Sequence, residues 1–221
     1  MSKNKLAKFK ELSLLSNTIQ PNQKEILTNS FPLKGKWNQE FKNNNPIVLE
    51  LGCGKGEYTV NLAEINPEVN YIGIDIKGAR IWKGATLAHK NKLDNVRFLR
   101  TQIEQLDKFF CDEEISEIWI TFPDPQIKYR RRKKRLTSVS MLESYKKILK
   151  KKGLIHLKTD SEFLHGFTLG ILDSMNVEIV KSTHDLYKSK IDNSVLKIKT
   201  FYETMFLKKK KPITYICFKF I

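Results

Sequence analysis

The stretch IVLELGCGKG, residues 47–56, decides how the rest of the sequence is interpreted. Its first five residues, IVLEL, form a strand-like run, and the glycines that follow allow a sharp turn in which the backbone can approach a ligand closely. A helical stretch from about Glu57 to Asn66 comes next. Strand, glycine turn and helix in this order predict the ligand-binding end of a parallel sheet, although such a turn can also lack any catalytic meaning.

Strand-like and helix-like segments alternate from this stretch onward. Alternation of this kind is typical of an α/β protein with a parallel sheet. We expect strands at 47–51, 71–76, 96–99, 115–122, 154–159, 177–180 and 213–220, and helices at 57–66, up to 92, at 138–151 and at 162–175. The polar residues before them predict a basic N-terminal arm, 1–45, with one short helix, followed by a single domain over 46–221.

The net charge narrows the class of partner. The 221 residues hold 40 Lys and Arg against 24 Asp and Glu, a formal charge of +16. Such a surface attracts polyanions, and nucleic acid is favoured over a membrane because no apolar run approaches about 18 residues. The N-terminus lacks an apolar leader with a cleavage site, so we expect a cytoplasmic protein.

Cysteine and histidine are scattered along the chain. The three cysteines have no C-x-x-C spacing, and His156 lies in an apolar run where a buried core imidazole is the simpler interpretation. We therefore expect no disulfide and no metal site.

Acidic residues at strand ends suggest which ligand the glycine turn binds. Asp75 ends the second strand, where an acid can accept hydrogen bonds from both hydroxyls of an adenosine ribose. The G-x-G-x-G spacing departs from the dinucleotide pattern, whose third glycine would fall at Glu57. Glu50 and Glu57 would repel a pyrophosphate and attract an ammonium or sulfonium, so the sequence favours S-adenosylmethionine over NAD.

The stretch FPDPQIKYRRRKKR, residues 122–135, places Asp124 between two prolines in front of a cationic run. The cations could hold RNA phosphates and so bring a nucleotide to Asp124. The alternatives are a solvated basic run, and an Asp124 that caps a helix or pairs with Arg130–Arg132.

With ELGCGKG, GIDIK, FPDPQIKYRRRKKR, KTD and TFYE in this order, the chain resembles the tRNA (guanine-N7)-methyltransferase family of class I methyltransferases from about residue 46 to its end. The resemblance implies a Rossmann-like α/β fold with a seven-stranded, mostly parallel sheet, an antiparallel last strand and helices on both faces. It implies S-adenosylmethionine as methyl donor and N7 of a tRNA variable-loop guanosine, guanine-46, as acceptor. The partner would be tRNA, and the enzyme a monomer or homodimer.

The resemblance also assigns roles to residues. It places the donor against Glu50, Asp75, Gln102 and Asp124. We expect the glycine turn, Gly52, Gly54 and Gly56, to bind the same donor, and Asp124 to be the catalytic residue. It places the acceptor substrate against Lys128, Asp160, Thr200, Phe201, Tyr202 and Glu203. It places RNA against Arg130, Arg131, Arg132, Lys133, Lys134 and Arg135.

Two positions depart from the family pattern. Gln102 stands where the family usually has Asp, and Gln126 replaces a tryptophan, for which Tyr129 is a possible substitute. Two assignments also have structural alternatives: Asp160 could cap the following helix, and Thr200 with Glu203 has the pattern of a capping box.

The expected chemistry needs no proton transfer. Guanine N7 has an in-plane lone pair and no proton, so the enzyme's task is alignment. Asp124 could accept from guanine N1 and N2 or from the methionine ammonium, and the sequence does not separate these roles. The rival functions are methylation of another RNA base, a non-catalytic RNA-binding module with a vestigial nucleotide pocket, and an NAD-dependent oxidoreductase.

Overall fold

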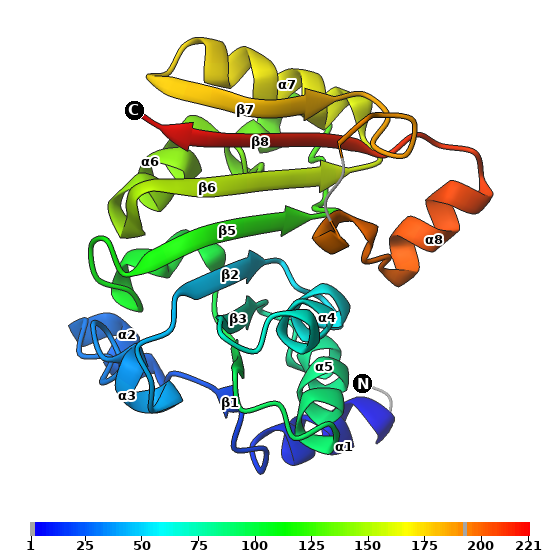
Figure 1. Ribbon diagram of the computed structural model, residues 1–221. Coiled ribbons are helices and arrows are strands. Elements are labelled where there is room, and N and C mark those ends of the chain that lie inside the picture. Colours follow the sequence, from blue (N-terminus) through cyan, green and yellow to red (C-terminus); the bar gives the residue numbers. More distant parts are fainter. Residues whose placement is uncertain (1–2, 192–193) are drawn as a thin grey trace.

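The computed structural model describes residues 3–191 and 194–221, which form an α/β fold around one sheet (Figure 1). Its described strands run in the order β1-β4-β3-β2-β5-β6-β8-β7, with β8 antiparallel to both β6 and β7. The predicted fold class and antiparallel last strand are confirmed. The strands are β1 Thr18–Ile19, β2 Ile47–Leu51, β3 Asn70–Ile74, β4 Val96–Leu99, β5 Ile115–Thr121, β6 Leu149–Thr159, β7 Val177–Thr183 and β8 Thr214–Phe220.

Helices cover both faces of the sheet, as predicted. Alternate residues of each strand point to opposite faces, so Leu49 and Val48 enter two different apolar clusters. Figure 1 shows α6 and α7 on one face and α4 and α5 on the other. The helices are α1 Lys3–Leu12, α2 Gln23–Thr28, α3 Trp37–Phe41, α4 Glu57–Ile65, α5 Gly78–Lys90, α6 Val139–Ile148, α7 Glu162–Asp173 and α8 Phe201–Lys208, with 3₁₀ segments η1 Ile103–Lys108, η2 Tyr129–Lys134 and η3 Ser194–Lys197.

The N-terminal region differs from its prediction. Residues 3–41 form helices α1, α2 and α3 and strand β1, not one short helix, and β1 makes the sheet eight-stranded where seven strands were predicted. Leu12 and Trp37 are fully buried, and Trp37 Nε1 donates to the carbonyl of Phe109 at 3.0 Å. Leu12 and Trp37 are far apart in the sequence and enter different apolar clusters, so the stretch lacks a sustained periodic pattern that predicts its elements.

Two other elements have bounds that the sequence did not predict. Helix α6 ends at Ile148, because Leu149 already pairs with Ile115 as the first residue of β6. Strand β7 continues to Thr183 and contains a bulge, since Ile179 and Lys181 face successive residues of β8 and leave Val180 unpaired in the ladder. Within the described ranges, no helix is both long and apolar enough to span a membrane.

Candidate active site

The carboxyl edge of the sheet gathers the polar residues that the sequence placed at strand ends. The order β4-β3-β2-β5-β6 puts Gln102, Asp75, Glu50, Asp124 and Asp160 along this edge in that sequence. Beyond the ends of β5 and β6 lies α8, beside α4 (Figure 1). Ligands of open α/β sheets bind at this edge, so the residues are placed for one common site.

The three glycines of the turn have different surroundings. All three have positive φ, which favours glycine. A Cβ at Gly52 or Gly54 would meet no atom closer than 3.8 Å, so the backbone is open to a ligand there. A Cβ at Gly56 would lie 2.6 Å from the ring of Phe98 and 3.1 Å from Gly84 Cα. The lack of a side chain at Gly56 therefore allows the close packing of α4 against α5, and its contact with the donor stays a prediction.

Asp75 is held next to this open backbone. Its Oδ2 accepts from Gly54 N at 3.0 Å, and its Oδ1 accepts from Lys77 N at 2.8 Å. The side chain is half-buried, and each carboxylate oxygen keeps a second lone pair for a ligand. Gln102 is exposed one strand further along the edge.

Glu50 is a buried acid, and its contact with the donor stays a prediction. It is 3% exposed and accepts hydrogen bonds from Thr59 N at 2.9 Å, from Thr59 Oγ1 and from Thr121 Oγ1 at 2.6 Å. Burial raises its pKa to about 7, against the lowering effect of the hydrogen bonds from Thr121 and Thr59. Glu50 therefore joins β2 to α4 and β5, and its negative charge is weaker than the sequence suggested.

A cavity of about 80 Å³ lies over the glycine turn. Its walls come from the turn, from Thr121 at the end of β5, and from Thr200 and Tyr202. Lys55 and Arg80 also line it beside Glu57, so the lining is not uniformly acidic. The argument from charge against a pyrophosphate is therefore weaker than the argument from the glycine spacing.

Asp124 lies in an exposed loop after β5. Its Oδ1 accepts from Gln126 N at 3.0 Å. Over the described residues the structure shows neither a helix cap nor an ion pair at Asp124, so both structural alternatives for it fail. Phe122 and Gln126 on either side have φ of 47° and 45°, a left-handed conformation that is uncommon outside glycine and clusters at functional sites.

The cationic segment follows this loop as η2. Lys128 and residues 130–134 are all exposed. Tyr129 is 76% exposed and lies under the guanidinium of Arg132, 4.2 Å from the ring centroid to Cζ. The exposed cations and the aromatic ring are thus available to a polyanion beside Asp124.

Arg135 differs from the cations before it. It is 5% exposed, and its guanidinium donates to the carbonyl of Gln126 at 3.1 and 3.3 Å. Its Cζ lies 4.7 Å from the ring centroid of Phe163 and 4.3 Å from that of Phe167. In this structure Arg135 therefore anchors the Asp124 loop to α7, and its contact with RNA stays a prediction.

The TFYE segment begins α8 and has two kinds of contact. Thr200 accepts from Glu203 N at 3.2 Å as the N-cap of α8, but the Glu203 carboxylate is fully buried in an ion pair with Lys158, so only half of the predicted capping box forms. Phe201 N donates to Glu57 Oε2 at 2.7 Å. Glu203 thus attaches the segment to β6, and Phe201 attaches it to Glu57 at the start of α4, next to the glycine turn.

Asp160 does not cap α7. The N-cap is Ser161, whose hydroxyl accepts from Leu164 N at 3.2 Å. Asp160 Oδ2 instead lies 3.7 Å from Lys211 Nζ. Its capping role is corrected, and its contact with substrate stays a prediction.

Sequence reasoning assigned no role to Lys158. His156 and Lys158 alternate within the apolar run of β6, which places both on one face of the sheet. His156 is a core imidazole as predicted: it stacks on Trp119 at 4.0 Å between ring centroids, and its Nδ1 lies 2.7 Å from Tyr215 Oη. The signal that could have identified Lys158 is a lysine on the buried face of an otherwise apolar strand, because a buried charge needs a partner.

Among the described residues, no group of three or more His, Cys, Asp or Glu is arranged to hold a metal.

Comparisons with known proteins agree with this fold. The family model described as "Putative methyltransferase" matches residues 44–216. A tRNA (guanine-N(7)-)-methyltransferase of Christiangramia forsetii is 58% identical over 99% of this chain and 98% of its own length. One of Bacteroides fragilis is 47% identical over 99% of this chain and 86% of its own. Among solved structures, the 16S rRNA methyltransferase KamB shares the fold at a TM-score of 0.65 and 13% identity, over 84% of this chain and 93% of that one.

Identity at this level over nearly the whole chain, together with the glycine turn and the carboxyl-edge acids, decides the family. The chain belongs to the tRNA (guanine-N(7)-)-methyltransferase family.

Proposed function

We propose that this protein transfers the methyl group of S-adenosylmethionine to N7 of guanine-46 in the variable loop of tRNA. Family membership supports the reaction. The observation that best supports the proposed site is the location of Asp124. It lies on a hydrogen-bonded loop between the glycine-turn cavity and the exposed cations of η2. The same loop can hold RNA and present one base to the edge where the donor binds.

The residues of the edge fit such a donor. When bound, S-adenosylmethionine supplies an electrophilic methyl on a sulfonium. Gly52 and Gly54 leave room for it, and Asp75 offers free carboxylate lone pairs to its ribose. The cavity of about 80 Å³ takes only part of it, since ligand sites usually measure roughly 300–1,000 Å³. Asp75, which is outside the cavity lining, would hold the donor's ribose.

The protein's contribution to the reaction is alignment. N7 carries no proton, so no residue need act as a general base, and positioned groups can supply the acceleration by themselves. Asp124 orients a reactant, either the guanine through N1 and N2 or the donor ammonium. The exposed cations hold the neighbouring phosphates.

The same proposal covers the remaining assignments. Lys128, Asp160 and residues 200–203 would form the acceptor side, and residues 46–221 the catalytic domain, on which the described part of the N-terminal region, residues 3–45, packs. The tRNA partner implies a reaction in the cytoplasm, carried out by a monomer or a homodimer.

Mapping the methylated base tests the proposal. Pure protein, S-adenosylmethionine with a labelled methyl group and an unmodified tRNA transcript should give 7-methylguanosine at the variable-loop guanosine. A transcript with adenosine at that position should take up no label. Label on another base would support the rival RNA methyltransferase, and donor-independent RNA binding without label would support the non-catalytic module.

Replacing Asp75 by alanine should weaken donor binding by about 1.5–3 kcal/mol, the contribution of hydrogen bonds to a charged group. Asp75→Asn should lose less, because its amide keeps one acceptor oxygen. Isothermal titration with S-adenosylmethionine measures both. Asp112→Ala, at an exposed acid near the opposite edge of the sheet, is the control and should bind as the wild type does. Unchanged affinity in Asp75→Ala would remove Asp75 from the donor site.

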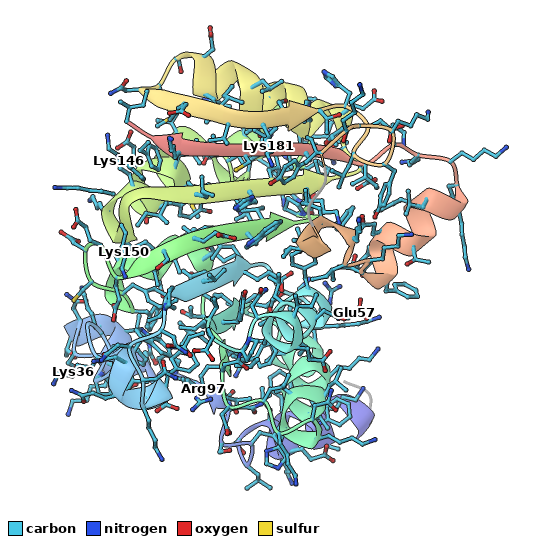
Figure 2. The ribbon with its side chains drawn as sticks, viewed as in Figure 1. Lys36, Glu57, Arg97, Lys146, Lys150 and Lys181 are labelled. Atoms are coloured by element: carbon cyan, nitrogen blue, oxygen red, sulfur yellow. The ribbon has the colours of Figure 1, made fainter. Side chains whose placement is uncertain are left out.

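Changing Arg131, Arg132 and Lys133 together to glutamine should remove up to about three phosphate contacts and flatten the log-log salt dependence of tRNA binding by roughly 2–3 units. Donor affinity should stay constant. The matched control changes three exposed lysines at the other end of the sheet, Lys147, Lys150 and Lys151, to glutamine. Figure 2 shows Lys150 at the opposite side of the molecule from Glu57. A salt slope that survives the first triple, or that falls equally in the control, would contradict specific RNA binding by η2.

A further inference from the structure

A fully buried ion pair joins the carboxyl end of β6 to α8. Lys158 Nζ lies 2.8 Å from Glu203 Oε1, and neither side chain is exposed to solvent. The same ammonium donates to the carbonyl of Leu196 at 2.8 Å and to that of Ile198 at 3.1 Å. All three donors of Lys158 are therefore used within the protein.

The pair is expensive to bury, so stability alone does not explain it. Burial lowers the pKa of Lys158, and the nearby Glu203 opposes this shift. Glu203 Oε1 also accepts from Tyr187 Oη at 2.6 Å, whereas Oε2 is buried without a hydrogen-bond partner among the described atoms. An apolar pair of similar size would often be at least as stable, and what an ion pair adds is a fixed geometry.

That geometry defines one wall of the glycine-turn cavity. Thr200 and Tyr202 line the cavity and lie between Ile198 and Glu203, two of the three residues that Lys158 binds. On the other side, Glu57 holds the backbone N of Phe201. Residues 198–203 are thus clamped between β6 and α4.

We propose that Lys158 is a positioning residue for methyl transfer. It binds no substrate and acts through residues 198–203, whose placement sets the wall that Thr200 and Tyr202 form against the reacting groups. The inference rests on the proposed function, because that function makes this cavity the site of the reaction.

The test removes both buried charges with little change of shape. In Lys158→Met/Glu203→Gln, methionine keeps an unbranched chain that is one atom shorter than that of lysine, and the glutamine oxygen can still accept from Tyr187. Loss of the contacts to Leu196 and Ile198 should make residues 198–203 mobile. We therefore expect kcat/KM for methyl transfer to fall roughly 10-fold or more because the reactants are misaligned. The variant should still unfold cooperatively on heating. The control Lys219→Met/Glu178→Gln removes an ion pair of 2.9 Å between β8 and β7, away from the edge, and should keep wild-type kinetics.

A double-mutant cycle separates positioning from a merely structural role. Tyr202→Ala should lower kcat/KM in the wild type but have little further effect in Lys158→Met/Glu203→Gln, because the wall is already displaced there. Additive effects, or wild-type kinetics in the double variant, would overturn the proposal. If the double variant does not fold, Tyr187→Phe decides: it removes only the hydroxyl bonded to Glu203, and unchanged kinetics would overturn the proposal. Absence of turnover in the wild type would instead refute the proposed function.

Discussion

Asp124→Ala should lower kcat for methyl transfer by about 100-fold or more, since a misplacement of about 1 Å can cost that much in an alignment-driven reaction. The structure holds Asp124 by one backbone hydrogen bond in a loop with left-handed residues on both sides. Asparagine retains the oxygen that accepts from Gln126 N, so Asp124→Asn should keep measurable activity. Single-turnover methylation of tRNA with labelled donor measures the three rates.

The pH dependence distinguishes orientation from base catalysis at Asp124. Because N7 has no proton to lose, the shape of the kcat–pH profile should be the same for the wild type and Asp124→Asn. Thermal melting should show only a small loss of stability in Asp124→Ala, which removes one exposed hydrogen bond, and none in Asp124→Asn. Equal rates for all three proteins would exclude Asp124 from the site, and an ionisation that disappears in Asp124→Asn would indicate proton transfer.

Arg135→Ala should lower the free energy of unfolding by about 2–4 kcal/mol, because it removes charge-assisted hydrogen bonds and a buried cation–aromatic contact. The guanidinium donates to Gln126 O and packs on Phe163 and Phe167. Urea denaturation measures the change. Arg131→Ala is the matched control: it is an exposed arginine four residues earlier, and its stability should change by less than about 0.5 kcal/mol.

These two arginines should also differ in RNA binding. Arg131→Ala should weaken tRNA binding in a salt-dependent way, whereas Arg135→Ala should act on RNA only through the stability and position of the loop. A stable Arg135→Ala protein with a reduced salt slope would return Arg135 to the RNA-contacting set.

The sequence predicted the layers of the fold because the central strands are apolar runs separated by breakers and helices. Strand β1 could not be found in this way, since Thr18 and Ile19 become a strand only by pairing with Phe98 and Leu99, about 80 residues away. The end of α6 was missed for a similar reason. The pairing of Leu149 with Ile115 overrides the helical preference of the lysines that follow.

The sequence predicted the location of the site, at the carboxyl edge of the sheet, but not the role of each residue there. Parallel strands end on one side of a sheet, so Asp75, Glu50 and Asp124 had to be neighbours. Burial, however, is decided by distant elements: α7 covers Arg135, and β6 supplies the lysine that meets Glu203. A single run of cations therefore contains both exposed residues and a buried anchor, which spacing alone cannot separate.

The exposed edge of strand β7 bears on how molecules of this protein associate at high concentration. It ends the sheet order, and Ile179 and Val180 are 43% and 40% exposed, which would favour joining to another strand edge. The bulge at Val180 interrupts the regular ladder, and Glu178 and Lys181 place charges on either side of it; Figure 2 shows Lys181 on this strand. At the opposite margin, β1 offers only two residues. Both margins thus discourage fibre-like growth by strand addition, and we expect any homodimer to form through helical or loop surfaces.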